Sequence, residues 1–161
     1  MAYTIDLLKD IRHRYMALAT LHKNKSTQPM PDIRTLVDTG AFNTMIDSYL
    51  AEKYGHMMPI FIPVVIGGHS GNAQGCILSK LIIGDIEMER VFALSYPFKD
   101  WLARHIILGT NVMNNWDFTI SRTDDILKFV ERIPSDAPNQ IYPYQNYFKN
   151  GEYVIVQNDM H

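Results

Sequence analysis

Cysteine is almost absent from this chain of 161 residues, because Cys76 is the only one. A single thiol excludes a disulfide within the chain and leaves no cysteine cluster for a structural zinc site. The 6 histidines show no His-x-x-x-His or Glu-x-x-His spacing, so a metal site would need ligands from distant positions. We therefore expect no metal and no cofactor, and a reducing compartment with the cytoplasm as the default location.

The chain also lacks a strong excess of charge and a long hydrophobic run. Its 15 basic and 17 acidic residues are scattered and give a formal net charge of -2. This balance offers no electrostatic footprint for nucleic acid or for an anionic membrane surface. The longest apolar stretch, 60–66, is interrupted by Pro63, and residues 1–14 carry several charges. We therefore expect a soluble protein without a signal peptide, a membrane span or a nucleic-acid partner.

Most of the chain falls into short runs with the hydrophobic pattern of β-strands. The length and the 47% hydrophobic content are enough for one domain with its own core. The runs are bounded by Gly, Pro, Asn or Asp, which is typical of strands joined by turns. The predicted strands are 14–22, 32–37, 60–66, 76–83, 86–95, 104–108, 116–121 and 126–133. We therefore expect a mainly β fold.

The last part of the chain has a different composition. Residues 135–151 are rich in Pro, Asn, Gln and Tyr, as in an extended connector, and residues 153–156 have the pattern of one final strand. We therefore predict a domain over residues 1–134 and a C-terminal extension over 135–161.

One segment has a helical period, shared by five apolar residues: Phe42, Met45, Ile46, Tyr49 and Leu50. Gly55 follows as a stop signal, so the pattern predicts a helix in the segment from Phe42 to Gly55. The opening stretch, with Ile5, Leu8 and Ile11, fits either a second short helix or a lead-in to the first strand.

The residues that could carry chemistry lie in the segment 35–41. Asp38 follows a predicted strand and is itself followed by the hydroxyl of Thr39 and by Gly40, which is free to adopt unusual backbone angles. Peptide N–H groups of such a turn can hold the carboxylate, and glycine lets a second chain approach closely. Alone, Asp-Thr-Gly is equally consistent with a surface turn, and it arises by chance in roughly one or two chains in a hundred of this length.

Two other segments strengthen the functional interpretation of Asp38. Far downstream, Ile106 and Ile107 lead into Leu108 and Gly109, a second apolar run that ends in glycine. Between the two motifs, apolar strands flank a glycine-rich segment as two strands flank a hairpin tip; its residues are Gly67, Gly68, His69, Ser70 and Gly71. A mobile tip of this kind can serve as a lid that excludes water from a cleft, although many glycine-rich hairpins are only turns.

Together the three segments resemble the retropepsin family of aspartic proteases. The family pattern is an apolar-apolar-Asp-Thr-Gly-Ala motif, here 36–41, then a glycine-rich segment, here 66–71, and an apolar-apolar-Gly motif, here 107–109. The resemblance covers roughly residues 15–131. It implies a closed, mainly antiparallel β-barrel with one or two short helices, in which Asp38 lies at the floor of a cleft.

The resemblance also assigns expected roles to the neighbouring residues. It implies that Ile107, Leu108 and Gly109 pack behind the Asp38 loop and support it. It implies that Ala41 and the glycine-rich tip contact the substrate, with His69 either reaching the substrate or simply lying at the surface. The helix predicted after Gly40 departs from the compact retroviral pattern and is similar to bacterial and cellular relatives.

A single Asp-Thr-Gly motif predicts that two chains must combine. Aspartic protease chemistry needs two carboxylates that share one proton, one acting as a base toward water and the other as an acid toward the scissile carbonyl. The sequence contains no second Asp-Thr-Gly and no Asp-Ser-Gly, so we expect the second carboxylate to be Asp38 of another copy in a two-fold homodimer. The resemblance implies that the Thr39 hydroxyl bonds across to the partner's loop. The final strand, 153–156, would either join the dimer interface or cover an edge of its own subunit.

Ala41 bears on the working pH of such a site. Pepsin-like enzymes carry a hydroxyl residue at this place, and donation from a hydroxyl favours the charged carboxylate. Because the methyl group of Ala41 cannot donate, we expect activity in a mildly acidic range.

Three functions are compatible with these observations. The leading hypothesis is a homodimeric aspartic endopeptidase that hydrolyses peptide bonds through an Asp38 pair. A catalytically silent retropepsin-like module for dimerisation or peptide binding is the alternative. A monomeric β-barrel that binds a small ligand and carries the motif by accident is the third. Cys76 lacks a nucleophile context, and Asp85, Asp124 and Asp125 are interpreted as solvated turn residues.

Overall fold

The computed structural model describes residues 2–10, 14–114, 117–130, 144–149 and 152–157. The strands in this part of the chain are β1 (Ala2–Asp6), β2 (Leu8–Lys9), β3 (Tyr15–His22), β4 (Met30–Val37), β5 (Met45–Asp47), β6 (Gly55–Ile66), β7 (His69–Ile83), β8 (Ile86–Tyr96), β9 (Ile106–Leu108), β10 (Asp117–Ser121), β11 (Ile126–Val130), β12 (Tyr144–Lys149) and β13 (Glu152–Gln157). The helices are α1 (Ser48–Tyr54), α2 (Thr110–Met113) and the 3-10 helix η1 (Asp100–Leu102). No helix in these ranges is long and apolar enough to span a bilayer.

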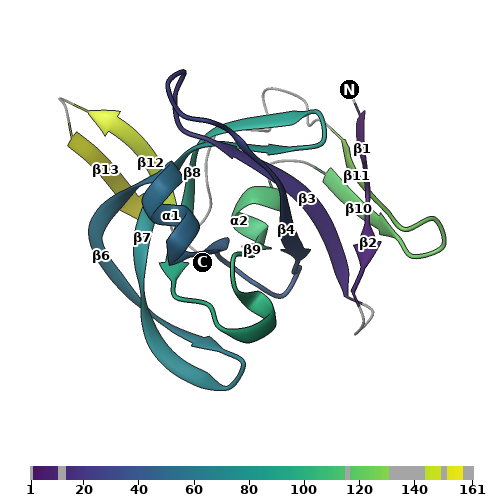
Figure 1. The fold of residues 1–161 in the computed structure, drawn as a ribbon, viewed down its shortest axis with the longest axis horizontal. Helices are drawn as coiled ribbons and strands as arrows, with labels where there is room; N and C mark the ends of the chain where they lie inside the picture. Colours follow the sequence, from purple (N-terminus) through teal and green to yellow (C-terminus); the bar gives the residue numbers. More distant parts are fainter. Residues whose placement is uncertain (1, 11–13, 115–116, 131–143, 150–151, 158–161) are drawn as a thin grey trace.

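The centre of the protein is a closed barrel. Within the described ranges, one sheet has the strand order β2-β3-β4-β9-β5-β8-β7-β6, and an additional pairing of β3 with β7 closes the strands between them into a cylinder (Figure 1). Most neighbours are antiparallel, but β4 pairs with β9 and β5 pairs with β8 in parallel. The prediction of a mainly β, barrel-like fold with short helices is confirmed.

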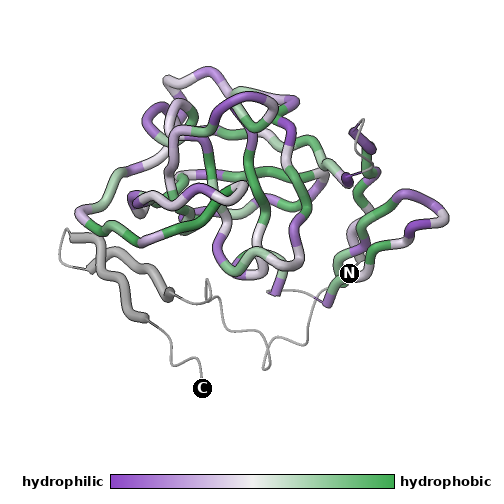
Figure 2. Tube along the Cα trace, turned by 90° about the horizontal axis from the view of Figure 1, so that it is seen from below, coloured by the Kyte–Doolittle hydropathy of each residue, from purple (hydrophilic) through white to green (hydrophobic). Residues whose placement is uncertain are grey.

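The barrel interior is filled by apolar side chains that alternate along the strands. In β3, Ala19 and Leu21 are fully buried while Leu18, on the opposite face, is 39% exposed. The closing pairing sets Leu21 opposite Leu81 of β7, which is also fully buried. Figure 2 shows hydrophobic residues along the barrel strands and hydrophilic residues at many of the connections. This alternation is why the strand predictions agree with the structure over most of the barrel.

The helix predicted in the segment from Phe42 to Gly55 is present, but the predicted start is wrong. Met45 and Ile46 enter the sheet as β5, between β8 and β9, where their side chains are buried. The helix begins only at Ser48, because the buried Asp47 carboxylate accepts a hydrogen bond from the N–H of Tyr49 at 3.3 Å and caps it. It ends before Gly55, as predicted. Apolar spacing alone did not separate a short strand from the helix that follows it.

The opening stretch forms strands, so the helical alternative is wrong; Ile11 lies outside the described residues. β1 pairs with β11 and β11 with β10 in a separate three-stranded sheet, which lies to the right of the barrel in Figure 1.

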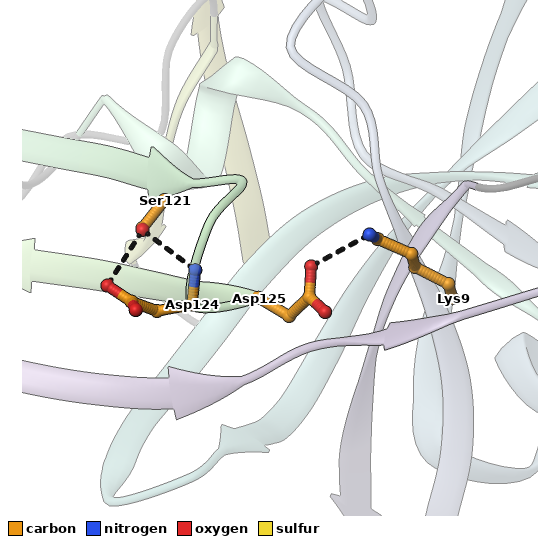
Figure 3. A network of polar contacts seen from close by, with 4 residues as sticks. All are labelled: Lys9, Ser121, Asp124 and Asp125. Atoms are coloured by element: carbon orange, nitrogen blue, oxygen red, sulfur yellow. Dashed lines mark hydrogen bonds and ion pairs between the residues drawn. The ribbon is translucent and has the colours of Figure 1, made fainter.

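This small sheet is tied to β2 by the turn between β10 and β11 (Figure 3). The N–H of Leu7 donates to the carbonyl of Asp125 at 2.8 Å, and Lys9 forms an ion pair with the Asp125 carboxylate at 3.0 Å. The hydrogen bond and the charge of Asp125 raise the pKa of Lys9. Asp124 pairs with Ser121 inside the turn, at 3.1 Å between side chains. Asp124 and Asp125 are therefore turn residues, as the sequence indicated.

The last strand predicted from the sequence, 153–156, corresponds to β13. It pairs with β12 of the same chain, which lies within the stretch interpreted as a connector. The boundary predicted at residue 134 and the connector over 135–143 lie outside the described residues, as do residues 116, 131–133, His13 and His161. The division into a domain and an extension stays a prediction.

Truncation of a side chain at the barrel closure tests this packing. We expect Leu21→Ala to lower the free energy of unfolding by about 2–5 kcal/mol, because it removes buried methyl groups and leaves a cavity. Urea denaturation followed by circular dichroism measures the change. Leu18→Ala, three residues away on the exposed face, is the matched control and should cost less than about 1 kcal/mol. Equal losses in the two variants would contradict the assignment of Leu21 to the interior.

Candidate active site

Asp38 lies directly after the last residue of β4. The end of that strand is aligned in parallel with β9, so that Val37 lies opposite Leu108. The pairing continues one residue further, because the N–H of Asp38 donates to the carbonyl of Leu108 at 3.1 Å. The backbone of Asp38 is thus fixed to β9, and its side chain is half-buried.

The turn after Asp38 holds the carboxylate. The N–H of Gly40 donates to Asp38 Oδ1 at 3.0 Å, and the N–H of Ala41 donates to the carbonyl of Asp38 at 3.2 Å. A Cβ on Gly40 would approach Asp38 Oδ1 to 3.3 Å, so a side chain there would crowd the carboxylate. Thr39 and Gly40 are exposed. The tripeptide therefore presents a held carboxylate within an exposed turn.

Gly109 allows the segment behind Asp38 to pack closely. A Cβ at this position would lie 2.6 Å from the carbonyl carbon of Asn43 and 2.8 Å from the nitrogen of Thr44. These are backbone atoms, so no side chain fits without moving the loop. Next to it, the N–H of Thr110 donates to the carbonyl of Ala41 at 2.9 Å. The structure thus brings the Ile107–Leu108–Gly109 motif against the Asp38 loop.

A buried polar network behind the loop was missed by sequence reasoning. Asn111 Oδ1 accepts from the N–H of Thr44 at 2.6 Å and from its hydroxyl at 2.7 Å, and Asn111 Nδ2 donates to the carbonyl of Phe92 at 3.0 Å. The hydroxyl oxygen of Thr44 also accepts from the N–H of Gly109 at 3.0 Å. Thr44 and Asn111 are both fully buried. Each residue follows one of the two motifs, but the preceding residues, Asn43 and Thr110, are also polar, so no local pattern marked Thr44 or Asn111 as buried.

The glycine-rich segment forms a hairpin whose turn is shorter than predicted. Gly67 and Gly68 both have positive φ, 56° and 81°, as a two-residue turn requires, and neither would meet another atom with an added Cβ. His69, Ser70 and Gly71, expected in the tip, already belong to β7. His69 and Ser70 are exposed there.

The hairpin and the Asp38 loop share one apolar cluster. Alternate residues of β6 are half-buried and pack against it; they are Ile60, Ile62, Val64 and Ile66. Ala41 and Leu36 pack against the same cluster from the Asp38 side, and Phe92 and Ile107 lie within it. The inner face of β6 is therefore apolar and lies on the side of the barrel that carries Asp38.

Other candidate groups do not join this site. Burial raises the pKa of the Cys76 thiol to about 12, and the side chain is fully buried in β7 between β6 and β8. It is therefore a packing residue, as the sequence indicated. Among the residues that the structure describes, no three His, Cys, Asp or Glu side chains come together as metal ligands would.

The arrangement defines the class of fold. No protein-family model matches the sequence, and no curated protein matches it by sequence comparison. Among solved structures, the chain is similar to a retropepsin-like aspartic protease from Rickettsia conorii, with a TM-score of 0.54 and 18% sequence identity over 80% of this chain and 91% of that chain. The protein thus has the fold of the retropepsin-like aspartic proteases, as its motifs predicted.

The support behind the Asp38 loop can be tested through Asn111. We expect Asn111→Ala to lower the free energy of unfolding by about 3 kcal/mol, because it leaves the buried groups of Thr44 and Phe92 without their partner. Chemical denaturation measures it. Asn114→Ala, an exposed asparagine at the end of the same helix, is the control and should change stability by less than about 1 kcal/mol. A small loss in Asn111→Ala would mean that the network is dispensable.

Proposed function

We propose that the protein is an aspartic endopeptidase that acts as a homodimer, with one Asp38 from each chain. The observation that carries the proposal is the geometry of the Asp38 turn. The half-buried carboxylate of Asp38 accepts the N–H of Gly40, and the backbone N–H of Asp38 donates to the carbonyl of Leu108, in a barrel of the retropepsin-like fold.

The chemistry follows from two such carboxylates side by side. Two carboxyl groups about 3 Å apart are not easily ionised at the same time, because their negative charges would repel each other. The pair therefore shares one proton. The ionised carboxylate removes a proton from water, whose oxygen attacks the peptide carbonyl carbon, while the protonated carboxylate donates to the carbonyl oxygen. The resulting tetrahedral intermediate loses its C–N bond, and the amine nitrogen takes up a proton as it leaves. The reaction consumes one water and needs no other reactant.

The exposure of the turn supports pairing with a second copy. Thr39 and Gly40 are exposed in the single chain, and Gly40 has no side chain that would hold a partner away. A two-fold axis beside this turn would bring the two copies of Asp38 together, each with the same neighbours. The Thr39 hydroxyl would then bond to the partner's loop and keep the two carboxylates aligned.

The apolar cluster supports a peptide substrate with apolar side chains. Ala41 and the inner face of β6, from Ile60 to Ile66, offer no charged group to a bound chain. The hairpin tip, from Gly67 to Gly71, would lie over the substrate backbone as a lid, with His69 and Ser70 as polar groups at the tip. Closure would exclude water from the reacting bond.

Replacement of Asp38 tests the proposal directly. We expect the purified protein to cut members of a diverse peptide library between mildly acidic and neutral pH, and Asp38→Asn to lower the rate at least about a hundredfold, because the amide is neither the base nor the acid. Mass spectrometry of the digests detects cleavage, and analytical ultracentrifugation gives the dimer fraction. Asp85→Asn, in the exposed turn between β7 and β8, is the matched control and should cut normally.

The outcomes separate the competing functions. Cleavage that disappears in Asp38→Asn and increases with the dimer fraction supports the protease. A dimer that cuts nothing favours a silent module for dimerisation or peptide binding. A stable monomer without activity contradicts the two-copy site.

The pH dependence tests the role of Ala41. A hydroxyl at this position can donate to the Asp38 carboxylate and favour its charged form. We therefore expect Ala41→Ser to keep the pair singly ionised to lower pH, so that the acidic limb of the kcat/KM profile moves toward lower pH. Ala41→Gly, which also cannot donate, is the control and should leave that limb in place. An unchanged limb in Ala41→Ser would show that the residue does not reach the carboxylate.

A further inference from the structure

The tip of the hairpin extends beyond the rest of the sheet. β7 pairs with β8 only as far as Gln74, which lies opposite Ser95. Beyond that point, β7 and β6 pair with each other up to the turn, from Phe61 opposite Gln74 to Ile66 opposite His69. We call residues 62–73 the arm. A two-stranded hairpin is marginally stable in water by itself, so the position of the arm depends on what it packs against.

One side chain from β8 lies against the arm. Tyr96 is the last residue of β8, and a Cβ added to Gly71 would lie 2.6 Å from Tyr96 Oη, 2.7 Å from its Cε2 and 3.0 Å from its Cζ. The ring therefore occupies the space that any side chain at position 71 would need. Gly71 does not have a positive φ, unlike Gly67 and Gly68, so its backbone does not require glycine. A side chain at position 71 would instead have to displace the ring of Tyr96.

Tyr96 also belongs to the apolar cluster beneath the arm. It is half-buried, its ring centroid lies 6.4 Å from that of Phe98, and it packs against the same cluster as Ile62, Val64 and Ala41. The ring thus lies against the arm at Gly71 and packs on the apolar cluster that contains Phe92 and Ile107 of the barrel.

We infer that Tyr96 is a positioning residue that holds the arm over the Asp38 side of the barrel, with Gly71 as the seat of its ring. The consequence for catalysis rests on the proposed function, because the arm would be the lid over the substrate. The position of the arm itself is a property of the single fold and can be measured without any activity.

Hydrogen exchange tests the contact independently of cleavage. We expect Tyr96→Ala to speed amide exchange in the arm at least tenfold relative to the wild type, an order of magnitude set by local opening, while residues 76–83 of β7 keep their protection. Tyr96→Phe retains the ring and should leave exchange in the arm unchanged. Tyr96→Leu keeps an apolar contact with a smaller side chain, and should give an intermediate increase if Tyr96→Ala does not fold. Unchanged exchange in the arm of Tyr96→Ala or Tyr96→Leu would overturn the inference.

The seat is tested by adding one methyl group. Gly71→Ala should loosen the arm as Tyr96→Ala does, because the methyl and the ring cannot share the space. In the double variant that carries Gly71→Ala and Tyr96→Ala, the added methyl group meets no ring. Amide exchange in its arm should therefore equal that of Tyr96→Ala alone. Additive effects would contradict the contact. Gly75→Ala is the matched control on the same strand: its Cβ would meet Phe92 Cε2 at 3.2 Å, outside the arm, where β7 is still paired with β8 and Gly75 lies opposite Leu94. It should not loosen the arm selectively.

Kinetics then connect the arm to the site. If the protein cleaves peptides, Tyr96→Ala should raise KM about tenfold with a smaller change in kcat, since a loosened lid weakens substrate binding before it alters the Asp38 pair. Tyr96→Phe should restore the wild-type KM. An unchanged KM in a variant with a loosened arm would separate the arm from catalysis. If the wild type cuts nothing, the exchange measurements still decide whether Tyr96 holds the arm.

Discussion

The fully buried amide of Asn111 is the point on which the arrangement of the candidate site depends. It joins the segment after the Asp38 turn, through Thr44, to β8, through the carbonyl of Phe92. Polar groups buried in an apolar surrounding are costly when unpaired, so each of these bonds selects one arrangement of the three segments. Gly109 completes the constraint, because only its missing side chain lets the two loops touch. The position of Asp38 thus depends on the residues packed behind its turn as well as on its own bonds to Gly40 and Leu108.

The structure combines tightly constrained surroundings of Asp38 with a less constrained arm. Around Asp38, backbone pairing and buried side-chain bonds act together, whereas residues 62–73 are paired only across one hairpin. Segments with fewer cross-links open more easily than the core to which they are attached. A protease that must admit a peptide chain and then enclose it needs both properties within one fold. The apolar cluster shared by Ala41, Tyr96 and β6 is where the two parts meet.

The sequence predicted the barrel and the Asp38 turn well, and for physical reasons. Alternation along a half-buried strand is a local property, so the strands could be placed from residue order alone. The stretch from Phe42 to Leu50 failed because the spacing of a short strand followed by a capped helix imitates a continuous helix. The bond between Thr44 and Asn111 joins residues 67 positions apart, and no local pattern reveals such a partner. The contact of Tyr96 with Gly71 also joins residues from different strands, so the sequence did not reveal it. A glycine in a hairpin is usually explained by the turn, which hid the role of Gly71 further.

The parallel pairing of β4 with β9 also determines when, during synthesis, the surroundings of Asp38 can be completed. It sets Thr35 opposite Ile106, so the backbone partner of Asp38 is supplied by a part of the chain made much later during synthesis. Contacts between such distant segments carry a larger loop-closure entropy than local contacts, so they form more slowly. A chain still emerging from the ribosome therefore carries the Asp-Thr-Gly sequence without the environment that holds it. Until the barrel is complete, the nascent chain lacks both the backbone partner of Asp38 and the buried bonds that hold the segment behind it.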